Sequence, residues 1–155
     1  MTYANIDKFD PNDIDETSWE SSGCSELDRW ILSELSSLVS QVTDGLDSYN
    51  PTDAGRSIQD FVDILSNWYV RRSRRRFWKS TNDDDKKGAY ITLYTCLTTL
   101  SQLLAPFTPF VSEEMYQNLV KSCYKEKPES VHLTDWPQAK WEVDKDLMSD
   151  MRVAM

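Results

Sequence analysis

Apolar residues recur at steps of three and four from Ser25 onward, which is the spacing of one face of an α-helix. The first run predicts a helix from Ser25 to about Asn50. Its apolar positions are Leu27, Ile31, Leu35, Leu38, Val42, Leu46 and Tyr49. Asn50 suits the cap of a second helix and Pro51 its first position, so we predict an antiparallel helix pair.

Three further helices complete the predicted core. The second carries Ala54, Ile58, Phe61, Val62, Leu65, Trp68 and Tyr69 on its buried face. The third begins at Asp83, ends before Pro106, and buries Tyr90, Leu93, Leu97, Leu100 and Leu104. The fourth starts at Thr108 and Pro109 and buries Val111, Met115 and Leu119. Four helices in sequence predict an all-α fold, an antiparallel helix bundle.

The segment SVHLTDWP, Ser130 to Pro137, lacks a helical period and predicts a short extended wrap after the fourth helix. We expect Val131, Leu133 and Trp136 to pack it on the bundle. A last amphipathic helix then begins, with Leu147, Met148, Met151 and Met155. The expected division is an acidic lead-in at 1–24, a helical bundle at 25–125, and the wrap with the start of a C-terminal helix at 126–155.

Composition agrees with one intracellular helical domain. The chain has 155 residues, 39% of them hydrophobic and only four glycines, which is enough to bury a core without disulfides or metals. No stretch approaches the roughly 20 apolar residues of a membrane span, so we expect a soluble, cytoplasmic protein with no membrane partner. Cys24, Cys96 and Cys123 are widely spaced, and we expect free thiols and no metal site.

Positive charge is concentrated in NWYVRRSRRRFWK, Asn67 to Lys79, although the net charge of the chain is −9. Five arginines and a lysine lie between Arg71 and Lys79, with no acid among them. Helical spacing places Arg71, Arg74, Arg75 and Trp78 on one face, and Arg72, Arg76 and Lys79 on the next. Guanidinium groups suit phosphate oxygens, and interleaved aromatic rings can stack on unpaired bases, so this run predicts an RNA-binding surface.

A structural alternative exists for the same residues. Arg72 and Arg76 could instead pair with the acidic lead-in or with the acids at Asp83 to Asp85. Trp68 and Tyr69 continue the apolar face of the second helix, so we expect them in the core rather than on RNA.

Catalytic motifs are missing from the sequence. It has no GxSxG, no P-loop, no glycine-rich dinucleotide motif, and a single histidine, His132, without catalytic partners. The adjacent acids Glu113 and Glu114 are explained by the first turn of a helix. We therefore predict no catalytic residue, no metal and no cofactor within this chain.

Several longer motifs resemble a known family. LDRWILSEL, Leu27 to Leu35, looks like the opening of the helical domain of the isoleucyl, valyl and leucyl class I tRNA synthetases. SNWYVRRSRRRFW, LLAPFTPFVSEEMYQNLV and SVHLTDWP continue the match. Together they resemble the anticodon-binding domain of isoleucyl-tRNA synthetase, in its eukaryotic-like branch, and YANID at Tyr3 to Asp7 resembles the link to the catalytic core.

This resemblance implies a domain that binds the anticodon stem-loop of isoleucine tRNA and positions the tRNA for aminoacylation. The ATP-using catalytic domain would lie outside this chain, which has neither an HxGH-type motif nor a KMSKS-like loop. The implied partners are the tRNA and the remaining synthetase domains. The expected tRNA-binding residues are Arg71, Arg72, Arg74, Arg75, Arg76, Trp78 and Lys79.

Two other functions stay open at this point. The chain could be the anticodon-binding domain of a valyl-tRNA synthetase, whose helical domain has a similar plan, although the arginine run disfavours it. It could also be a helical protein-interaction module whose arginine helix docks an acidic partner.

Overall fold

The computed structural model describes residues 24–79 and 83–155, and within these it is helical with no strand. The helices are α3 (Glu26–Asp47), α4 (Pro51–Ile64), α5 (Arg71–Lys79), α6 (Asp83–Leu104), α7 (Pro109–Tyr116) and α8 (Lys145–Ala154). The predicted all-α fold is confirmed. The acidic lead-in, apart from residue 24, lies outside the described residues.

Helices α3 and α4 begin at the residues that their caps specify. Ser25 caps α3, and Asp28 completes a capping box by accepting from the Ser25 backbone. Tyr49, at a positive φ of 57°, and Asn50 form the tight turn into α4. The Asn50 side chain accepts from the backbone N–H of Asp53, and Pro51 occupies the first turn of α4.

Helix α4 continues without a break into α5 through η2 (Leu65–Val70), a stretch of π-helical winding. Side chains turn inward along this continuous helix at nearly constant steps of four. The buried positions are Ala54, Ile58, Phe61, Leu65, Tyr69, Ser73 and Phe77. The wider winding of a π segment explains why the four-residue step persists, and π segments frequently mark functional sites. Val62, which we predicted to be buried, is 38% exposed because it falls between these steps.

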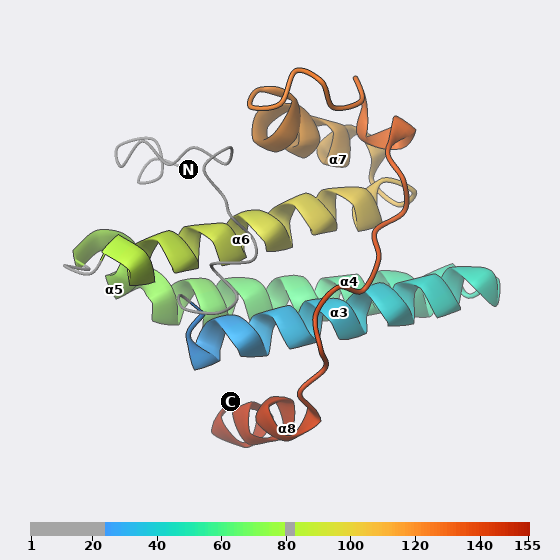
Figure 1. Cartoon of the computed structure of the whole chain (residues 1–155). Coiled ribbons are helices and arrows are strands. Elements are labelled where there is room, and N and C mark those ends of the chain that lie inside the picture. The colour runs from blue at the N-terminus through green and yellow to red at the C-terminus, as the bar shows by residue number, and fades with distance from the viewer. Residues whose placement is uncertain (1–23, 80–82) are drawn as a thin grey trace.

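Helix α3 forms the centre of the core. It packs on α4, α6 and α8, and α3 and α4 lie side by side with α6 running alongside them (Figure 1). Its fully buried residues include Trp30, Ile31, Leu35 and Val42. No helix in the described part of the chain is long and apolar enough to cross a membrane.

Helix α7 packs on the far end of α6 and continues as the π-helical η3 (Gln117–Lys121). Tyr116, Leu119, Val120 and Val131 form a second small core there. Val111 is 59% exposed, so our assignment of it to the buried face of this helix was wrong. Leu119 is buried and Met115 is partly buried, as predicted, and Tyr116 joins them on the buried face.

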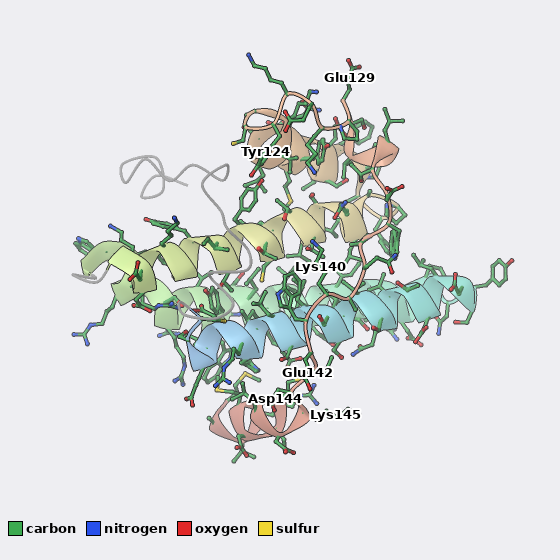
Figure 2. All side chains as sticks on the ribbon, viewed as in Figure 1. Tyr124, Glu129, Lys140, Glu142, Asp144 and Lys145 are labelled. Atoms are coloured by element: carbon green, nitrogen blue, oxygen red, sulfur yellow. The ribbon has the colours of Figure 1, made fainter. Side chains whose placement is uncertain are left out.

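The segment from Thr134 to Asp144, which we call the strap, runs from α7 across α3 to α8 (Figure 1). It is antiparallel to α3: Trp136 bonds to Thr43, the Trp141 backbone to Ser36, and the backbone at Glu142 and Asp144 to Ser33. The predicted extended wrap is confirmed in this part, and Lys140 and Glu142 mark its course (Figure 2).

The beginning of the wrap differs from our prediction. Val131 to Leu133 form one 3-10 turn, η4, rather than extended chain. Leu133 is 69% exposed, so our prediction that it packs on the bundle was wrong. Glu113 of α7 accepts hydrogen bonds from the hydroxyl of Ser130 and the backbone of Val131, and these bonds hold the segment with Val131 inward.

Candidate nucleic-acid interface

Helix α5 presents four arginines on the surface of the bundle. Arg71, Arg72, Arg74 and Arg75 are all exposed. The side chains of Arg71, Arg74 and Arg75 make no hydrogen bond or ion pair within the described part of the chain. With no acid in this helix, four guanidinium groups crowd within one and a half turns, and the resulting positive potential suits an anionic partner.

Two aromatic residues accompany these arginines at the surface. The guanidinium of Arg72 lies over the ring of Trp68, 4.7 Å from its centroid. This cation–π contact keeps Arg72 on the bundle while leaving the residue exposed. Trp78, in the last turn of α5, is 62% exposed. An exposed indole beside exposed guanidinium groups can stack on an unpaired base.

Tyr69 and Phe77 face the interior. Tyr69 is fully buried and Phe77 is 9% exposed. The Phe77 ring packs against Tyr90 of α6, with 5.2 Å between the centroids. Our prediction that Tyr69 belongs to the core is confirmed, and half-buried Trp68 also packs against the core. Phe77 is therefore an anchor of α5 rather than a stacking platform.

Arg76 occupies a different position from the other arginines. Its side chain is only 14% exposed and forms a bidentate ion pair with Asp28 of α3. Nη1 donates to Oδ1 over 2.8 Å and Nη2 to Oδ2 over 2.7 Å. Nε donates to Asp85 over 2.8 Å. The donors of Arg76 are therefore engaged by two acids. This agrees with the structural alternative, in which Arg76 pairs with acids of the same chain instead of contacting RNA.

Asp28 is the centre of this network. It is fully buried, and its carboxylate also accepts from the Tyr69 hydroxyl over 2.6 Å and from Ser25. Burial alone would raise the pKa of Asp28, but the hydrogen bonds from Arg76 and Tyr69 outweigh burial and lower it. Burial also opposes the charge of Arg76, and pairing with Asp28 more than compensates, so the Arg76 pKa is raised.

The remaining predicted residue, Lys79, ends α5, but its side chain lies outside the described residues. The structure thus brings Arg71, Arg72, Arg74, Arg75 and Trp78 to one exposed helix and turns Arg76 inward. The acids that engage Arg76 were partly visible in the sequence. Asp85 belongs to the acidic cluster that we considered as its partner, and Asp28 is the last of the eight acids in the acid-rich first 28 residues, the other group that we considered.

Other titratable and nucleophilic side chains in residues 24–79 and 83–155 do not gather into a site. None of the three cysteines is in a disulfide, and burial raises the pKa of the Cys96 thiol, which keeps it protonated. Among the described residues, no three His, Cys, Asp or Glu side chains could hold a metal ion. His132 is exposed on η4. An open groove of about 730 Å³ lies between α6 and the strap, and its lining includes threonine and tyrosine side chains such as Thr98 and Tyr124.

Comparison with known proteins agrees with this geometry. The family model described as the anticodon-binding domain of tRNA ligase matches residues 28–155. Similar proteins named isoleucine–tRNA ligase occur in Dehalococcoides mccartyi strain 195 (60% identical over all of this chain), Clostridium tetani (51% over 89%) and Thermus thermophilus (44% over all of it).

The chain spans only 13–15% of the length of these relatives. They come from bacteria, and the eukaryotic-like branch stays a prediction. The match to the family model covers α3 through α8, including the arginine helix and the strap. This chain therefore belongs to the family of anticodon-binding domains of tRNA ligases.

Proposed function

We propose that this chain binds the anticodon stem-loop of isoleucine tRNA, as the anticodon-binding domain of an isoleucyl-tRNA synthetase. The observation that carries the proposal is helix α5, with four exposed arginines and an exposed tryptophan on an otherwise acidic chain. The names of the relatives support the choice of isoleucine over valine.

The residues have separate roles in this proposal. Arg71, Arg74 and Arg75 contact backbone phosphates, and Trp78 stacks on an unpaired base. Arg72 contacts phosphate from its place over Trp68. Lys79 remains in the proposed set from its position at the end of α5. Arg76 leaves the set, because its guanidinium already satisfies Asp28 and Asp85.

Aminoacylation, with its use of ATP, belongs in this proposal to the catalytic domain of the whole synthetase, in the cytoplasm. This chain would hold the anticodon end of the tRNA so that the acceptor end reaches the catalytic domain. Phosphate contacts by α5 would provide affinity and orientation, whereas discrimination among anticodons requires contacts with base edges.

The test is to titrate the 155-residue chain with an isoleucine-tRNA anticodon stem-loop and with the same stem carrying a scrambled anticodon, at several salt concentrations. We expect tighter binding of the true anticodon. The logarithm of affinity should fall with the logarithm of salt concentration with a slope of about −3, as expected for roughly four phosphate contacts. Equal affinities for the true and the scrambled anticodon would mean that the domain contacts RNA phosphates without reading the anticodon bases. Absence of binding at low salt would contradict the proposal and favour docking to an acidic protein.

A further inference from the structure

Helix α5 has few anchors of its own. Only Ser73 and Phe77 among its described side chains are buried, and Phe77 packs on Ala89 and Tyr90 of α6. Four exposed arginines in the same helix repel one another. A nine-residue helix with this composition needs tertiary contacts to keep its shape and position. Arg76 makes several polar contacts that hold α5 to the bundle.

The geometry of Arg76 fixes α5 against two other helices at once. Its planar fork meets Asp28 of α3 through both terminal nitrogens, and its Nε meets Asp85 of α6. Nη2 also donates to the backbone carbonyl of Asp85 over 3.0 Å. A bidentate guanidinium–carboxylate pair restricts orientation as well as distance. These bonds therefore constrain both the position and the rotation of α5.

The carboxylate that receives Arg76 is itself held rigidly. Asp28 is the third residue of α3 and takes part in the capping box with Ser25. Tyr69, whose ring is fully buried, donates its hydroxyl to Asp28 Oδ1 over 2.6 Å. Since Tyr69 lies in η2, just before α5, the carboxylate holds the same continuous helix at two places, Tyr69 and Arg76.

We propose that Asp28, Tyr69, Arg76 and Asp85 are positioning residues for RNA binding: the buried Asp28–Arg76 pair sets the orientation in which α5 presents its exposed arginines. This inference rests on the proposed function. It assigns no RNA contact to the four residues. They affect the affinity for RNA indirectly, because they keep α5 folded and correctly oriented.

The experiment uses the 155-residue chain with Asp28→Asn, Asp85→Asn and the control Glu34→Gln. Glu34 is also a buried carboxylate of α3, but its ion pair is with Arg152 of α8, away from α5. Three properties are measured for each variant: affinity for the anticodon stem-loop across salt, the melting temperature, and amide hydrogen exchange along Arg71–Lys79 and Pro51–Ile64.

We expect Asp28→Asn to weaken RNA binding about tenfold and to flatten the salt slope by roughly 0.7–0.9 for each phosphate that α5 no longer reaches. Amide exchange should accelerate in α5 and stay unchanged in α4. Asp85→Asn should act in the same direction with a smaller effect, because the pair with Asp28 remains. Glu34→Gln should retain wild-type affinity and slope. A merely structural role would lower the melting temperature without a selective change in the salt slope or in α5 exchange.

The inference would be overturned if both Asp variants kept the wild-type affinity and salt slope. It would also be overturned if Glu34→Gln reduced the affinity as much as the Asp variants do. If Asp28→Asn does not fold, Asp85→Asn and Arg76→Lys answer the question, because lysine keeps the charge but cannot span both carboxylates. If the wild-type chain binds no RNA, the proposed function fails. The exchange data then still show whether the pair orders α5.

Discussion

The indole N–H of Trp136 donates a 2.8 Å hydrogen bond to the hydroxyl of Thr43, a residue 93 positions earlier in the chain. Thr43 donates its own proton to the backbone carbonyl of Val39, so the bond fits into the helix without leaving a donor unused. Together with the bonds at Ser36 and Ser33, this contact attaches the strap along α3. Attachment of the strap to the bundle therefore depends on the hydroxyl groups of Thr43, Ser36 and Ser33 in α3.

Replacing Trp136 by phenylalanine should destabilise the chain by about 1 kcal/mol, the usual net contribution of one hydrogen bond. Thr43→Val should have a similar effect. The double variant should cost little more than either single one, because both changes remove the same bond. Urea unfolding measures the three free energies, and fully additive effects would show that the two residues act independently.

Reversing two exposed charges, Arg71→Glu with Arg75→Glu, should weaken RNA binding at least tenfold, since two phosphate contacts become repulsive. The free energy of unfolding should change by less than about 1 kcal/mol because both side chains are exposed. The matched control is Arg56→Glu with Lys140→Glu, which changes the net charge equally at exposed sites outside α5. Equal reductions of affinity in both pairs would mean that only net charge matters.

Stability should depend on acid pH through Asp28. The folded pKa of Asp28 is lowered, so its contribution to stability is complete above the unfolded pKa of about 3.9 and is lost as pH falls through the folded value. The difference in unfolding free energy between wild type and Asp28→Asn should therefore shrink as pH falls from about 6 toward about 2. A difference that is constant across this range would contradict the assignment.

Glu34 should behave in the opposite way. Burial raises the pKa of Glu34 and the nearby Arg152 only partly compensates, so ionising Glu34 costs more free energy in the folded state than in the unfolded state. Glu34→Gln should leave stability at neutral pH unchanged or raise it by about 1 kcal/mol. The two proteins should differ less once Glu34 is protonated at low pH. A destabilisation above about 1 kcal/mol at neutral pH would show that the ion pair outweighs burial.

The sequence by itself determined the helices and the arginine cluster. Caps such as Ser25 and Asn50, the three-and-four spacing of apolar residues, and the run from Arg71 to Lys79 all act through neighbours in the chain. Such local preferences can be recognised without a structure. The family motifs also lie within single continuous segments, so they pointed correctly to an anticodon-binding domain.

Only the tertiary structure decided which arginine faces inward. Spacing placed Arg76 beside Arg72 on an outer face, yet the π-helical winding of η2 and the arrival of Asp28 from 48 positions away turn it into the bundle. The same holds for Val111 and Leu133, whose exposure depends on how α7 and η4 pack. Ion pairs between distant segments, and the burial of a side chain by such segments, depend on tertiary packing. The spacing of residues along one helix therefore cannot predict them.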